Sequence, residues 1–247
     1  MKNELFYNQV SADYDEMISF EKSLDRKKKV FANFIKSELK TAADCGCGTG
    51  VDSIALSQLG LKVTAFDPSA DMVSKAKRNA ESLNEQIEFQ NYSIEKISDS
   101  FKNRFDLIVS LGNTFANIRK EDFDDSIKKC YELLNPDGTL IIHILNYHKI
   151  LKEQNRIVNI TQGKENYFIR FYDFETDKVN FNILTFKQSN PSEFKLITTL
   201  VYPHTIENFE NALNNAGFRQ PKIFANLNFD EFKIDSSKDI FLRAIKG

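Results

Sequence analysis

The sequence predicts an α/β fold, in which a doubly wound, mostly parallel sheet carries an inserted antiparallel β cap. Up to Ile142, strand, loop and helix segments alternate, as in a parallel sheet with helices on both faces. Four segments rich in β-branched and aromatic residues then follow each other. They lie near residues 156–161, 166–174, 178–187 and 194–202. These four read as antiparallel strands of the cap.

The elements on either side of the cap complete the core. Apolar residues recur at helical spacing through residues 24–39, which predicts an amphipathic helix packed on the sheet. After the cap, Thr205 is expected to cap a helix that ends at Ala216, and two last strands follow near 221–226 and 238–245. We therefore divide the chain into three parts. They are an N-terminal arm and helix (1–40), a core (41–147 and 205–247) and an inserted cap (148–204).

A glycine-rich stretch, Asp44-Cys45-Gly46-Cys47-Gly48-Thr49-Gly50, precedes the next helical segment. Glycine has no Cβ, so it adopts positive φ and lets a ligand approach the bare backbone. Such a turn alone is weak evidence, because many nucleotide-binding and non-binding turns share it.

The apolar run Val63–Phe66 ends in a carboxylate, Asp67, where the second strand of a doubly wound sheet should end. A carboxylate at this place can bind the hydroxyls of a ribose. NAD enzymes also carry an acid there, but their loop usually reads Gly-x-Gly-x-x-Gly. Here the glycines alternate and an acid, Asp44, precedes them.

This spacing resembles the class I S-adenosylmethionine-dependent methyltransferases. Three more stretches match: Asn91-Tyr92 after the third strand, Phe105–Val109 as the fourth strand, and Leu133–Leu140 as the turn into the fifth. The resemblance implies a Rossmann-like, seven-stranded sheet. It also implies S-adenosylmethionine as the cofactor, with S-adenosylhomocysteine as the product.

More restrictive stretches resemble the glycine/sarcosine N-methyltransferases: Leu111–Ala116, Asn146-Tyr147 and Tyr202-Pro203-His204. The resemblance implies transfer to the nitrogen of a small-molecule amine. Two alternatives stay open. One is methylation of oxygen or carbon in a small molecule or of a protein side chain, and the other is a cofactor-binding protein without activity.

The resemblance implies a set of cofactor contacts. The glycines would meet the amino-acid end of the cofactor, Asp67 its ribose, and Asn91, Met72 and Tyr92 its adenine. Met72 and Tyr92 are equally explained as core residues. A cation, Arg26, or Lys27 if the alignment shifts by one, would pair with the cofactor carboxylate. The full set is Arg26, Asp44, Gly46, Gly48, Gly50, Asp67, Pro68, Met72, Asn91, Tyr92 and the Leu111 backbone.

The expected catalytic residues are Tyr14, Asn113 and Tyr202. Tyr14 would belong to an arm, residues 1–18, that closes over the methyl donor and excludes water. Asn113 could instead be a turn residue, and a structural hydrogen bond is the favoured role of His204. The acceptor is expected to contact Asn113, Leu145, Tyr167, Arg170 and Tyr202.

One departure concerns the acceptor. Relatives that methylate glycine carry an arginine directly before the Asn-Tyr pair, where it can bind the substrate carboxylate in a bidentate fork. Here that position is Leu145, so free glycine is in doubt unless another cation enters the pocket. Arg170 is the nearest candidate. Tyr167 and Arg170 would share its pocket only if a bulge intervenes, since they fall on opposite faces of a regular strand.

The charge and hydropathy of the chain indicate which classes of binding partner to expect. The formal net charge is −2, and Arg26–Lys29 is the only basic cluster, most simply a solvated helix face, so nucleic acid is not expected. No apolar stretch approaches the ~20 residues of a membrane span, and the polar start Met1–Glu4 lacks a signal-peptide core. We expect a cytoplasmic protein with a small-molecule substrate and leave a homo-oligomer open. The three cysteines predict no metal site.

Overall fold

The computed structural model describes residues 2–35, 37–175 and 178–247. A seven-stranded sheet forms the core, in the order β10-β11-β5-β4-β1-β2-β3. Its strands are β1 (Thr41–Cys45), β2 (Lys62–Phe66), β3 (Glu88–Gln90), β4 (Phe105–Ser110), β5 (Leu134–Leu145), β10 (Phe218–Phe224) and β11 (Asp239–Lys246). Only β11 runs antiparallel to its neighbours. The predicted doubly wound, mostly parallel sheet is confirmed.

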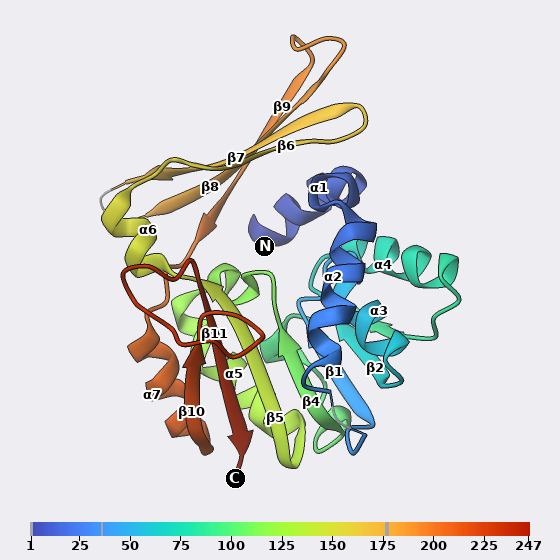
Figure 1. Ribbon diagram of the computed structural model, residues 1–247, viewed down its shortest axis with the longest axis vertical. Coiled ribbons are helices and arrows are strands. Elements are labelled where there is room, and N and C mark those ends of the chain that lie inside the picture. Colours follow the sequence, from blue (N-terminus) through green and yellow to red (C-terminus); the bar gives the residue numbers. More distant parts are fainter. Residues whose placement is uncertain (1, 36, 176–177) are drawn as a thin grey trace.

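Helices cover both faces of this sheet (Figure 1). On one face lie α2 (Phe20–Ala32), α3 (Val51–Gln58) and α4 (Ala70–Ser82), and on the other α5 (Lys120–Leu133) and α7 (Ile206–Ala216). The central strand β4 packs against both helix layers, because Leu107 and Val109 point to the first face and Ile108 to the second. Within the described residues, no helix is both long and apolar enough to cross a membrane.

The ends of two helices show how the sequence positions them. Thr205 caps α7 through a reciprocal capping box with Asn208, and Gly217 ends the helix with φ +96°. The helix predicted over 24–39 is shifted, however. It begins at Phe20 and ends at Ala32, and the amides of Phe34 and Ile35 only make turn bonds back to Phe31. The apolar residues beyond the helix still pack on the core, so their spacing reflected burial rather than helix.

A separate four-stranded antiparallel sheet forms the cap, with strands β6 (Ile157–Gln162), β7 (Asn166–Phe174), β8 (Val179–Lys187) and β9 (Phe194–Val201). The chain enters it through α6 (Tyr147–Glu153), directly after β5 ends. The cap therefore lies over the carboxyl ends of the parallel strands (Figure 1). All four strands fall within the cap that the sequence predicts.

The N-terminal segment is a helix, α1 (Lys2–Ile18), that lies between the cap and the core (Figure 1). Phe6, Val10 and Met17 are buried against Met72 of α4 and the inner face of the cap. This segment therefore contributes to the core. Its apolar residues do recur at helical spacing, but their partners come from distant parts of the chain.

Polar contacts fix α1 on both sides. Toward α4, the Asn8 side chain accepts a hydrogen bond from the Ser69 hydroxyl at 2.5 Å, and Asp15 accepts one from Asn79 at 2.9 Å. Toward the cap, Glu16 accepts the backbone N–H of Glu165 at 2.9 Å. Thus α1 connects the cap to the core.

Candidate functional site

The glycine loop connects the end of β1 to α3. Gly46, Gly48 and Gly50 have φ of +86°, +53° and +90°, which L side chains rarely adopt. A Cβ on Gly46 would lie 2.3 Å from the Thr114 side chain, whereas one on Gly48 would meet nothing nearer than Tyr14, at 4.0 Å. Gly46 is thus required by packing, and Gly48 leaves its backbone open to a ligand.

Asp67 lies directly after β2, beside this loop. One carboxylate oxygen accepts the Gly48 N–H at 2.9 Å and the other accepts the Ser69 N–H at 2.9 Å. Burial raises the pKa of Asp67 to about 6, although both backbone hydrogen bonds act in the opposite direction. A carboxylate oxygen has two acceptor positions, so each keeps one for a ligand hydroxyl.

Asp44, in contrast, faces the protein interior. It is 1% exposed and accepts a hydrogen bond from the Ser53 hydroxyl of α3 at 2.5 Å. Burial and the negative charge of Asp52 raise the pKa of Asp44 to about 7. The structure therefore shows Asp44 organising the loop and the start of α3.

The residues expected around adenine divide into two groups. Pro68, Asn91 and Tyr92 are exposed beyond the ends of β2 and β3, and the Asn91 side chain donates to the Asp67 carbonyl at 2.8 Å. Met72 is fully buried beneath α1. Met72 can border a ligand only if α1 moves.

The two cations predicted for the cofactor carboxylate lie differently on α2. Arg26 is exposed on α2, because the buried positions Phe20, Leu24 and Phe31 set the helical phase on the other side. Lys27 turns toward α3 and pairs with Asp52 at 2.7 Å. Lys27 is thus held next to the start of α3, whereas Arg26 faces solvent.

The predicted acceptor residues after β4 and β5 do come together. Asn113, with φ +71°, donates to the Tyr147 hydroxyl at 2.9 Å and accepts the Leu145 N–H at 3.0 Å. Leu111 is buried, and its carbonyl accepts the Thr114 hydroxyl at 2.8 Å. Asn113 thus fixes the ends of two neighbouring strands, which makes it a structural residue whatever else it contacts.

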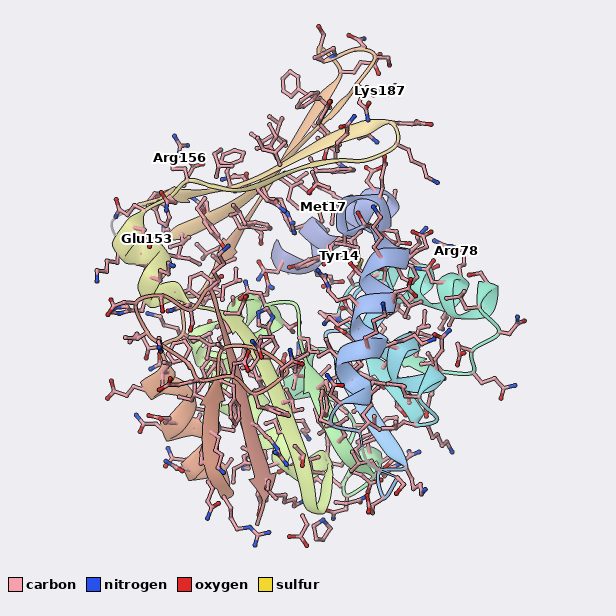
Figure 2. All side chains as sticks on the ribbon, in the orientation of Figure 1. Tyr14, Met17, Arg78, Glu153, Arg156 and Lys187 are labelled. Carbon is pink, nitrogen blue, oxygen red and sulfur yellow. The ribbon has the colours of Figure 1, made fainter. Side chains whose placement is uncertain are left out.

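Two further residues face this region from above. Tyr14 of α1 lies closest to Gly48, and Tyr14 and Met17 are labelled between the cap and the core in Figure 2. Arg170 of β7 is close enough that its positive charge lowers the pKa of Tyr14, while burial, the larger effect, raises it. Tyr14 thus lies beside Gly48, and Phe168, on the same face of β7 as Arg170, packs with Tyr14.

Tyr167 lies on the other face of the cap sheet. The pairing of β7 with β8 runs without a register shift, so Tyr167 and Arg170 point to opposite faces; the irregularity is in β6. Tyr167 stacks on Phe186, with ring centroids 5.4 Å apart. The bulge that could have placed Tyr167 beside Arg170 is absent from β7.

Tyr202 follows β9, and its backbone N–H donates to the Ala116 carbonyl at 2.7 Å, in the turn that begins after Asn113. Burial raises the pKa of its phenol. His204 is buried, stacks on Phe123 at 4.1 Å and bonds the Ile118 carbonyl at 2.8 Å. The structural role expected of His204 agrees with these contacts.

Sequence reasoning missed three residues of the site. Ser69 caps α4 and ties it to α1, and Thr114 packs on Gly46. Tyr172 of β7 is buried and packs in the same apolar cluster as Tyr147. Ser69 follows Asp-Pro before a helical pattern, which is a recognisable cap signal. No local sequence pattern identifies Tyr172, because Tyr147, its neighbour in this cluster, lies in another element, at the start of α6.

The residues around Gly48 fit S-adenosylmethionine. The open backbone at Gly48 can receive its amino-acid end, and the free acceptor positions of Asp67 suit a ribose diol. Two buried oxygens nearby, Thr49 Oγ1 and Asp15 Oδ1, have no hydrogen-bond partner among the described residues. A ligand with several donors would satisfy these groups.

The comparisons with known proteins agree with this geometry. Residues 42–138 match the methyltransferase domain family. The glycine/sarcosine N-methyltransferase of Aphanothece halophytica is 30% identical over 142 residues, which cover 57% of this chain and 54% of that protein. The chain spans about half the length of the glycine/sarcosine N-methyltransferases it matches. The protein YqeM of Bacillus subtilis is 24% identical over 98% of both chains.

Among solved structures, a S-adenosylmethionine-dependent methyltransferase from Clostridium acetobutylicum ATCC 824 has a TM-score of 0.75 at 20% identity. It covers 98% of this chain, and this chain covers 99% of it. The likeness therefore includes the cap and α1 as well as the core. The strand order, the glycine loop and the matched methyltransferase domain together support a class I S-adenosylmethionine-dependent methyltransferase.

Proposed function

We propose that this chain transfers the methyl group of S-adenosylmethionine to the nitrogen of a small-molecule amine. The observation that carries the proposal is the placement of Gly48 and Asp67 next to Asn113 and Tyr147, at neighbouring strand ends beneath the cap. A small acceptor suits this site, since α1 and the cap cover it. The name of the Aphanothece halophytica relative supports an amine.

Methyl transfer requires little acid–base catalysis by the protein. When bound, S-adenosylmethionine supplies a methyl group already activated on a sulfonium, so the residues mainly align the partners and exclude water. The amine must be neutral to attack. Burial raises the pKa of Tyr14, so its phenol stays protonated and acts as a hydrogen-bonding, positioning group.

Two measurements test the proposal. Calorimetry should show binding of S-adenosylhomocysteine, and labelled S-adenosylmethionine should give methylated product with members of a panel of amines but not with hydroxylated aromatics or peptides. Binding without transfer to any compound would favour a protein that binds the cofactor without catalysis. Transfer only to hydroxyl groups or peptides would contradict the amine assignment.

Leu145→Arg tests the position of the acceptor. The Leu145 amide is held by Asn113, so an arginine there would extend from a fixed point next to the proposed acceptor. We expect kcat/KM for glycine to rise by roughly tenfold or more, the scale of one hydrogen bond to a charged group. Leu151→Arg, on the exposed part of α6, is the matched control. An equal effect of both variants would mean that the acceptor lies elsewhere.

A further inference from the structure

Arg170 presents a cation on the inner face of the cap. It shares this face of β7 with Phe168 and Tyr172, which are 0% and 3% exposed. The Nε of Arg170 donates to Asn159 Oδ1 at 2.7 Å, on the neighbouring strand. This bond fixes the plane of the guanidinium. Its two terminal nitrogens have no hydrogen-bond acceptor among the described residues.

Two other cations of the cap are paired with acids. Arg156 pairs with Asp173, and Lys187 pairs with Glu193 at 2.5 Å, both at exposed positions (Figure 2). Arg170 is half-buried, yet no carboxylate of a described residue lies within 4.0 Å of it. Withdrawing a charge from water without a partner is costly, so such groups are usually paired. A bound anion would therefore stabilise the charged guanidinium of Arg170, since no described residue provides one.

The neighbours of Arg170 on this face of β7 connect it to both parts of the site. On one side, Phe168 packs with Met72 and Tyr14. On the other, Tyr172 packs in the same apolar cluster as Tyr147. Arg170 therefore lies on a face of the cap that packs on α1 and on the start of α6.

We propose that Arg170 binds an anionic group of the methyl acceptor and determines specificity for amines that carry a carboxylate. This inference rests on the proposed amine methylation. Arg170 would bind the substrate carboxylate, which Leu145 cannot bind because it carries no charge. The Nε bond to Asn159 leaves an edge of the guanidinium that can donate two parallel hydrogen bonds to one carboxylate.

The test uses the full chain and a series of ω-amino acids from glycine to 5-aminopentanoate, each beside its amide. In the unmodified protein, kcat/KM for at least one acid should exceed that for its amide by about 10- to 100-fold, the range of a hydrogen bond to a charged group. Arg170→Met should remove this preference, and Arg170→Lys should restore part of it. Lys187→Met is the control from the same sheet and should leave the preference unchanged.

The remaining outcomes separate this inference from the proposed function. If amides react as well as acids in every pair, or if Arg170→Met leaves the preference intact, Arg170 does not bind the acceptor. If Arg170→Met instead weakens S-adenosylhomocysteine binding tenfold, the cation serves the donor's own carboxylate, and the inference fails. If no compound is methylated, the proposed function fails. The role of Arg170 is then tested by calorimetry, with the acids titrated into protein loaded with S-adenosylhomocysteine. Binding that is lost in Arg170→Met would support the inference, and no binding to the unmodified protein would refute it.

Discussion

At the scale of single residues, Asp67 both holds the glycine loop and offers acceptor positions to the cofactor ribose. Its two oxygens already hold Gly48 and Ser69, so an added ribose would use an acceptor that is fixed in place. Asp67→Ala should weaken S-adenosylhomocysteine binding by about 1–3 kcal/mol, measured by calorimetry. Asp71→Ala, an exposed acid in the first turn of α4, is the matched control. Unchanged affinity in Asp67→Ala would remove Asp67 from the cofactor site.

The same carboxyl predicts a pH dependence. Because its pKa is about 6 in the folded protein, Asp67 loses its acceptor charge as the pH falls below 6. Affinity for S-adenosylhomocysteine should therefore decrease on going from pH 7 to pH 5, and Asp67→Asn should flatten this profile. A profile that is equally steep in both proteins would point to another group.

The effect on folding has the opposite sign. Between the usual value of 3.8 and about 6, the folded protein keeps the Asp67 proton that the unfolded chain has lost. The contribution of this carboxyl to stability therefore falls as the pH rises through that window. Denaturant unfolding at pH 4 and pH 7 should show a smaller loss of stability in Asp67→Asn than in the unmodified protein.

Residue positions were predictable where the backbone sets them. Gly48 and Asp67 follow the ends of β1 and β2, so the spacing in the sequence placed them correctly beside each other. The directions of the Arg26 and Tyr167 side chains were less predictable. Their directions depend on the phase of a helix and on the face of a strand, which packing decides and a local pattern does not.

At the scale of elements, α1 covers the site. Since it buries Met72, binding of adenine next to that side chain requires α1 to open. We expect the amides of α1 to exchange hydrogen faster without ligand than with S-adenosylhomocysteine. Asn8→Ala, which removes the bond to Ser69, should increase exchange in the free protein. Equal protection of α1 in all three samples would exclude a lid.

The cap strands were readable from the sequence because each has strong β-forming residues bounded by turn residues. The helix α1 was not. Its apolar positions are separated by polar side chains that are only half-buried, and the surface they pack on is built from α4 and the cap. A window along the chain does not contain those partners.

At the scale of the whole molecule, α1 holds the cap and the core together. Phe6→Ala should lower the free energy of unfolding by about 3–5 kcal/mol, since the side chain is 3% exposed between α1 and the cap. Leu5→Ala, the exposed neighbour on the same helix, should cost far less. Urea denaturation measures both. Equal costs would show that the cap is joined to the core by other contacts.

The contacts of α1 also bear on the order in which the protein folds. Asn3 receives a hydrogen bond from Thr199, and Glu16 receives the N–H of Glu165. A ribosome makes α1 before the cap, and the surface that buries its apolar side exists only after strand β9 has emerged. The N-terminal helix is therefore completed late. During synthesis its apolar side stays exposed, and pairing over such long sequence separations is slow.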